Sequence, residues 1–152
     1  MAYSSAEARI QMLEDIAAVA DELAMALASL SEAYEELDDD AADALEEAMF
    51  RPVQGAYGRL KRAHTEFSAR QRLPEHRFEA RSAGAHSADP RVYIERALEA
   101  AESADQAIAD LQDSMMPVEV GDQELRAGLA EARSALADVP NQGRRLLRTV
   151  GR

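Results

Sequence analysis

His64 and the basic side chains around it are the residues of this sequence that are best suited to chemistry. Arg59 and Arg62 precede the histidine, and Arg70 follows it. Imidazole changes its protonation state near neutral pH, and neighbouring positive charges lower its pKa. This combination predicts a site that binds a small anion or accepts a phosphoryl group. The candidate ligand-binding residues are His64, Arg59, Arg62, Phe67, Arg70, Arg72 and Arg77.

A second interpretation of His64 needs no ligand. The residue lies between Leu60 and Phe67 in an apolar repeat with helical spacing. Buried polar side chains are usually hydrogen-bonded within the protein. The sequence therefore favours a structural histidine that is bonded to a main-chain carbonyl or to an acid of the first helix.

The position of His64 on an expected helix invites comparison with histidine phosphotransfer domains, which are small four-helix bundles with a reactive histidine. Those domains carry an apolar residue two positions after the histidine, a lysine at three and a glycine at four. Here these positions are Glu66, Phe67 and Ser68. The comparison therefore gives no family assignment.

Other kinds of site find no support in the sequence. The chain has no cysteine, which excludes disulfides, thiolate nucleophiles and cysteine-bound metal. It has no Glu-x-x-His pair of the kind that holds two iron ions in a helical bundle, and no glycine-rich nucleotide motif. We therefore predict no catalytic residue, no metal site and no cofactor.

Charge is distributed unevenly along this acidic chain, whose formal net charge is −12. Residues 1–50 carry −13, residues 51–81 carry +5, residues 82–143 carry −8 and residues 144–152 carry +4. A basic segment beside acidic helices predicts ion pairs between helices, which help to select neighbours. The acidic balance argues against nucleic acid and anionic membranes as partners, and leaves a small anion as a candidate ligand.

The elements that must position these residues are long amphipathic helices. The first, residues 6–37, has an apolar repeat in steps of three and four, and similar repeats mark residues 41–70, 90–115 and 123–139. We predict an all-α fold: an antiparallel up-down-up-down four-helix bundle over residues 1–143, with a short fourth helix. Residues 144–152 are set apart as a basic C-terminal tail.

Two irregularities interrupt this pattern. Pro52 lies inside the second helix and predicts a kink near residues 49–51, or a break followed by a new helix. Residues 71–88 lose the helical repeat, which makes an unusually long connection. The short fourth helix would leave the start of the first helix uncovered, and this gap must be filled by the long loop, the tail, a second subunit or a ligand.

These features predict a non-enzymatic interaction or scaffold protein. It would self-associate, as a homodimer, through the uncovered seam at Ile10, Leu13 and Ala17, or bind another helical protein there. The alternative is a bundle that binds an anion or small molecule around His64, by analogy with phosphotransfer. The sequence shows no basic and apolar leader and no apolar run of the ~18 residues that a membrane span needs, so we expect a cytoplasmic protein.

Overall fold

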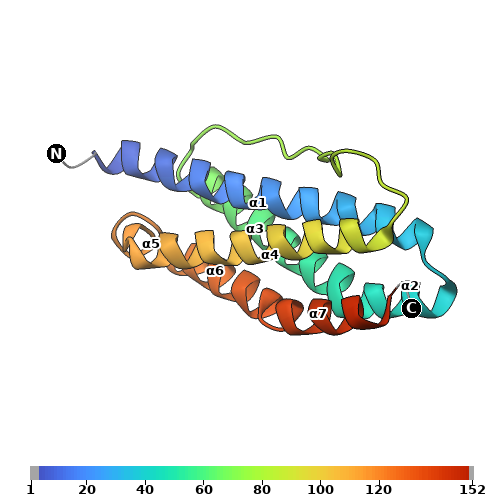
Figure 1. The fold of residues 1–152 in the computed structure, drawn as a ribbon. Helices are drawn as coiled ribbons and strands as arrows, with labels where there is room; N and C mark the ends of the chain where they lie inside the picture. The colour runs from blue at the N-terminus through green and yellow to red at the C-terminus, as the bar shows by residue number, and fades with distance from the viewer. Residues whose placement is uncertain (1–3, 151–152) are drawn as a thin grey trace.

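The computed structural model describes residues 4–150, and in this range the regular secondary structure is all helix, with no strand (Figure 1). Two short stretches lie outside this description: residues 1–3, at the N-terminus where the sequence predicts no leader, and residues 151–152, which include Arg152 of the expected tail. The helices are α1 (Ser5–Glu36), α2 (Asp39–Leu45), the π-helical turn η1 (Glu46–Phe50), α3 (Arg51–Arg70), α4 (Pro90–Asp113), α5 (Met116–Glu119), α6 (Gln123–Leu136) and α7 (Val139–Thr149).

None of the helices in the described part of the chain combines the length and the apolar character that crossing a membrane requires.

Short polar side chains begin four of these helices. Ser4 accepts a hydrogen bond from the main-chain N–H of Glu7 at the start of α1, and Asp38 accepts one from Ala41 at the start of α2. Asp89 and Asp122 cap α4 and α6 in the same way. Such caps satisfy the N–H groups that a helix leaves unpaired at its N-terminus.

Pro52 neither breaks the second helix nor ends it, because the chain absorbs the proline with one widened turn. Helices α2 and α3 are joined without a gap through η1. At the end of η1, the N–H of Arg51 bonds the carbonyl oxygen of Glu46, five residues earlier, which is the π-helical pattern. The widened turn lies directly before the residue that has no N–H to donate, so a π-bulge accommodates the proline near the position expected for a kink, and the alternative of a break and restart does not occur.

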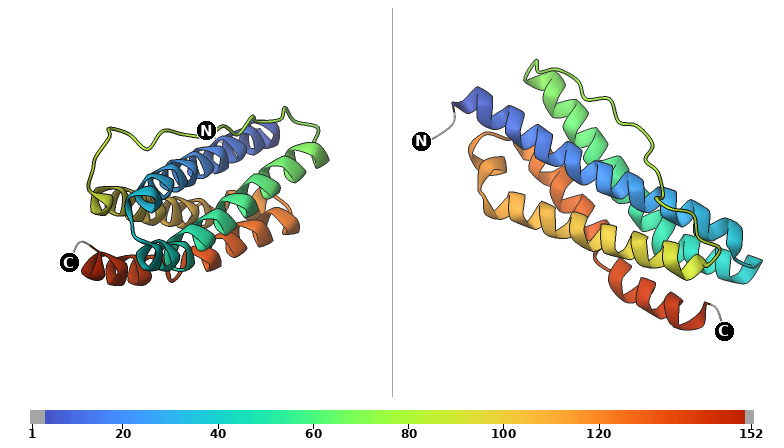
Figure 2. Two further views of the ribbon diagram at one scale, coloured as in Figure 1. Left: turned by 90° about the vertical axis from the view of Figure 1, so that its right-hand side faces the viewer. Right: turned by 45° about the horizontal axis from the view of Figure 1, so that its top comes forward.

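The order of the helices differs from the expected up-down-up-down arrangement. Helix α1 packs on α3 and α4, and α6 packs on α3, while α7 packs on α4 (Figures 1 and 2). Both α3 and α4 run opposite to α1, so they run in the same direction as each other (Figure 1). Residues 71–89, which we call the crossing segment, pass over α1 to join the end of α3 to the distant start of α4.

The length of the crossing segment explains this difference. A tight connection between consecutive opposite helices needs about two to eight residues. A link of this length can reach the far end of a helix such as α4, which is 24 residues or about 36 Å long. Bundles with one long crossover connection use such a link between two parallel helices.

Residues 144–149 belong to α7 and do not form a separate tail. Helix α7 begins at Val139, and its buried residues Val139, Gly143 and Leu146 recur at helical spacing. The side chain of Arg91 on α4 donates hydrogen bonds to the carbonyl oxygens of Leu147 and Val150. The basic residues lie on the outer side of an amphipathic helix whose inner side joins the core.

Candidate functional site

The crossing segment fills the space beside His64. The histidine is on α3 and is 3% exposed. The ring of Phe78 meets it edge-on at a centroid distance of 5.2 Å, and the ring of His76 lies 5.7 Å away. The rings of His76 and Phe78 are themselves 4.6 Å apart. Three aromatic side chains from α3 and the crossing segment therefore pack where the sequence left a gap.

Burial sets the protonation state of His64. Desolvation is the main cause that lowers the pKa of His64, and the nearby charge of His76 lowers it further. The main-chain carbonyl of Leu13 on α1 acts in the opposite direction. The Nδ1 atom is buried and has no hydrogen-bond partner. The imidazole is therefore neutral at neutral pH and packs as part of the core.

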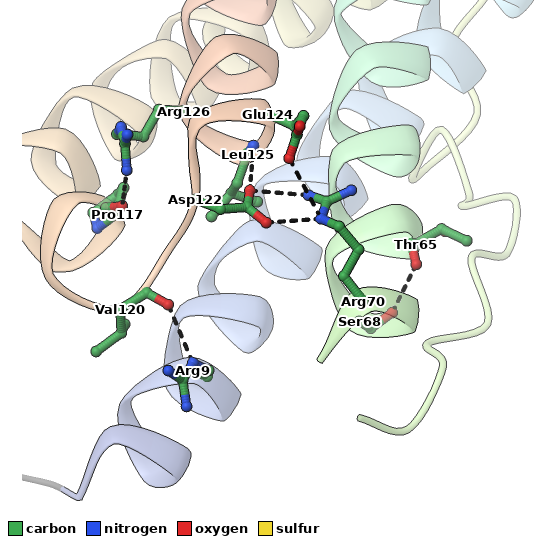
Figure 3. A network of polar contacts seen from close by, with 10 residues as sticks. All are labelled: Arg9, Thr65, Ser68, Arg70, Pro117, Val120, Asp122, Glu124, Leu125 and Arg126. Atoms are coloured by element: carbon green, nitrogen blue, oxygen red, sulfur yellow. Dashed lines mark hydrogen bonds and ion pairs between the residues drawn. The ribbon is translucent and has the colours of Figure 1, made fainter. Parts of the chain in front are cut away.

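Three of the arginines predicted to bind an anion contact different carboxylates of this chain. Arg70 forms two hydrogen bonds with Asp122, from Nε to Oδ2 at 2.7 Å and from Nη2 to Oδ1 at 2.9 Å (Figure 3). Arg59 pairs with Glu131 of α6 at 3.4 Å, and Arg77 pairs with Glu79 at 3.7 Å. Arg59 and Arg70 thus form ion pairs between helices, of the kind that the charge distribution predicts. Arg77 forms its ion pair within the crossing segment.

Arg70 and Asp122 tie the end of α3 to the start of α6. Asp122 also accepts a hydrogen bond from the N–H of Leu125 at 2.9 Å, so one carboxylate caps a helix and binds a guanidinium (Figure 3). Burial alone would raise the pKa of Asp122, but these hydrogen bonds bring the pKa below its usual value. Arg70 therefore has a structural task at this end of the molecule.

The other predicted site residues have varied positions. Phe67 is fully buried in the core, and Arg62 is exposed on α3. Arg72 has a left-handed backbone with φ of 55° directly after α3. The N–H of Leu73 bonds the carbonyl of Ser68, and the N–H of Arg72 bonds that of Ala69, which is the Schellman pattern of a helix end.

The expected interface residues are largely covered by their own chain. Leu13 is 5% exposed and Ala17 is 6% exposed, whereas Ile10 is 44% exposed. Arg81 of the crossing segment forms an ion pair with Asp21 of α1 at 2.8 Å, which fastens the segment along this side of the helix. Leu73, Phe78 and Ala83 of the crossing segment pack against the core on this side, so Leu13 and Ala17 lie within the chain while Ile10 stays exposed.

A long groove between α1 and α4 was not foreseen from the sequence. It consists of two adjoining pockets of about 510 and 330 Å³, and Glu22 lines both of them. Its floor is made of small and apolar side chains, with Met25 exposed at one end. We call this feature the α1–α4 groove; its lining includes Asp15, Ala18, Val19, Glu22, Met25, Ser29, Arg96, Glu99, Ala100, Ser103, Ala107, Asp110, Leu111 and Met116.

Acidic side chains border this groove. Asp15, Glu22, Glu99 and Asp110 all line it. The Oε2 atom of Glu22 is buried and has no hydrogen-bond partner. The one cation in the lining, Arg96, donates hydrogen bonds from Nη1 to the carbonyl oxygens of Ala83 and Ala85, at 3.0 and 2.7 Å. Asp15 and Asp110 accept hydrogen bonds from Gln11 and Gln106 of their own helices. Within residues 4–150 none of the four carboxylates forms an ion pair, which suits a positively charged partner.

The sequence held a partial signal for this groove. Ala18, Ala100 and Ala107 interrupt the large apolar residues of two helices, and small side chains let helices approach closely and leave shallow surfaces. Which helix pairs with which depends on the crossing segment, so the pairing of α1 with α4 along this side could not be read from either helix alone. Within residues 4–150, no group of three or more potential metal-ligating side chains comes together.

Comparison of this chain with protein-family models, with curated proteins and with solved structures finds no match.

Proposed function

We propose that this chain is an antiparallel four-helix bundle with one crossover connection that acts as a non-enzymatic interaction module. In this proposal it works in the cytoplasm and binds another helical protein through the α1–α4 groove. The four long units are α1, the continuous helix from α2 to α3, α4, and α6 with α7. Each unit packs lengthwise on two others, so the bundle is a rigid frame that presents its outer grooves.

The observation that carries this proposal is the combination of a largely apolar lining and acidic borders in the two adjoining pockets of the α1–α4 groove. Surface grooves between helices commonly receive the apolar face of a partner helix. Here Met25 is 43% exposed within the lining, although it is large and apolar. A partner that covers Met25 and the alanines would bury apolar surface that the isolated chain leaves in water.

Self-association through Ile10, Leu13 and Ala17 has less support than a different partner. Leu13 and Ala17 are buried within the chain itself, so they offer little surface to a second subunit. Pairing of two α1–α4 grooves about a two-fold axis would place carboxylates against carboxylates. We therefore expect a monomer of 16.6 kDa when the purified chain is measured by light scattering.

The same reasoning removes support from an anion site at His64. The imidazole is covered by Phe78 and His76, and Arg59 and Arg70 pair with carboxylates on α6 and at its start. With His64 only 3% exposed, its ring offers little surface to the anion that the sequence-based alternative would bind.

The test of the proposed function compares two matched variants. Ala18→Arg places a long cation in the groove, and Ala130→Arg makes the same change at an exposed position on α6. Proteins captured from cells by the wild-type chain are purified and rebound to each variant by calorimetry. We expect a captured partner to bind wild type and Ala130→Arg equally and to lose at least tenfold in affinity for Ala18→Arg. If the captured partners bind Ala18→Arg with the same affinity as wild type, the groove is not the functional surface.

A further inference from the structure

The α1–α4 groove has about the length of a four-turn helix. Along α1 its lining extends from Asp15 to Ser29, and along α4 from Ser114 back to Arg96. The fifteen residues from Asp15 to Ser29 span about 21 Å of helix, or nearly four turns. A partner helix of similar length would therefore lie along the groove and contact both walls throughout.

The floor of the groove accepts apolar side chains from such a helix. Ala18 on α1 and Ala107 on α4 are small and leave room, and Leu111 and Val19 provide apolar walls. Met25 adds a flexible, polarisable side chain that adapts to different apolar partners. An apolar stripe at spacings of three and four residues on the partner would fill these positions.

The borders of the groove select the charge of the partner. Asp15 and Asp110 lie towards one end, Glu99 lies nearer the other, and Glu22 lies between them where the two pockets adjoin. Glu22 is the most informative of these, because burying a carboxylate oxygen without a hydrogen-bond donor is unfavourable. A lysine or arginine of a partner would supply the missing donor and a positive charge.

The basic helices of a second copy are not suited to this role. The apolar side of α7, which includes Gly143 and Leu146, is already packed inside its own molecule. The apolar side of α3 is buried in the same way. A second copy would offer arginines without an apolar face to enter the groove.

From these observations, and resting on the proposed interaction function, we infer that the α1–α4 groove binds a cationic amphipathic helix of about four turns from another protein. Its apolar stripe would cover Ala18, Met25 and Ala107, and its flanking lysines or arginines would pair with Glu22 and Glu99.

The probe for this inference is a synthetic 18-residue amphipathic peptide of leucine and lysine that carries a fluorescent label. A second peptide keeps the leucines and replaces every lysine with glutamate. Binding to the full chain is measured by fluorescence anisotropy at low and high salt. We expect saturable one-to-one binding of the cationic peptide that weakens as salt rises, and no binding of the acidic peptide.

Variants locate the binding site. Ala18→Arg should weaken binding of the cationic peptide at least tenfold. Because an exposed ion pair contributes about 0.2 to 1 kcal/mol, Glu22→Gln combined with Glu99→Gln should weaken it about 2- to 30-fold. The control that removes two acids outside the groove, Glu14→Gln with Asp43→Asn, should bind within about twofold of wild type. Thermal unfolding of each variant verifies that it folds.

The outcomes separate this inference from the proposed function. Equal weakening by the control acids would show nonspecific attraction to an acidic protein and would overturn the inference. If the captured cellular partner is lost with Ala18→Arg but is not displaced by the cationic peptide, the groove is functional and the cationic helix is the wrong ligand. If the partner is unaffected by Ala18→Arg, the proposed function itself fails.

Discussion

Two glycines in equivalent helical settings provide a quantitative test of how α3 packs against α6. Gly128 lies on α6, where an added Cβ would come within 2.7 Å of the Cβ of Ala63 on α3. Gly58 lies on α3 itself, and an added Cβ there would meet nothing within 4 Å. Replacing each glycine with alanine therefore makes the same chemical change with and without a steric conflict.

The expected effects have opposite signs. Alanine is about 1 kcal/mol more favourable than glycine inside a helix, so Gly58→Ala should stabilise the protein by about that amount. At Gly128 the same gain is opposed by overpacking, which typically costs about 1 to 3 kcal/mol because carbon atoms prefer separations of about 3.5 to 4.0 Å. Gly128→Ala should therefore be neutral or destabilise by up to about 2 kcal/mol.

Urea denaturation followed by circular dichroism measures both variants, and the difference between them should be about 1 to 3 kcal/mol with an unchanged m-value. Adding Ala63→Gly to Gly128→Ala removes one of the two conflicting Cβ atoms, so the double mutant should show favourable coupling in a double-mutant cycle. If Gly128→Ala stabilises the protein as much as Gly58→Ala does, α3 and α6 do not approach closely here and the described packing is refuted.

Three further predictions concern His64, Arg72 and Asp122. The folded chain lowers the pKa of His64 below 6.5, so the unfolded chain binds more protons, and the free energy of unfolding should fall as the pH drops below about 6.5 and be retained above it. His64→Leu should remove this dependence, so that the stability measured by urea denaturation changes less between pH 7.5 and 5.5. An unchanged slope would contradict the assignment. Arg72→Gly should raise the free energy of unfolding in urea by about 1 kcal/mol, because glycine adopts the left-handed backbone with φ of 55° without strain. A destabilised variant would argue against the described end of α3. Asp122→Ala should lower the melting temperature through loss of about 1 kcal/mol from the cap alone, and Asp122→Asn, which keeps a capping oxygen, should lose less.

The helices could be predicted from the sequence because their signals are local. Ser4, Asp38, Asp89 and Asp122 cap helices in the structure, and the apolar repeat that follows each cap supplies buried side chains. The response to Pro52 was less predictable, because a kink, a break and a π-bulge all accommodate a missing N–H. Packing on both sides of η1, with Leu45, Met49 and Val53 fully buried, keeps the helix continuous.

The candidate site was harder to predict because it depends on contacts between distant residues. His64 looked reactive because several arginines are near it in sequence, yet Arg59 and Arg70 are bound by Glu131 and Asp122, which follow more than fifty residues later. The loss of the helical repeat marks residues 71–88 as a long connection, but it does not give the direction in which the connection runs, and this direction decides which helices become neighbours. An up-down-up-down order pairs the helices differently, so it does not predict the α1–α4 groove.

The crossing segment connects the covered side of α1 with the open one. Near its start, Phe78 closes the space over His64, and Arg81 holds the segment to Asp21. At its far end, Ala83 and Ala85 are held by Arg96 and form one end of the α1–α4 groove. One stretch of chain therefore covers His64 beside α1 and also lines one end of the α1–α4 groove. A helix bound in that groove would contact the segment at this end, so its position would be set by the same hydrogen bonds that anchor the crossover.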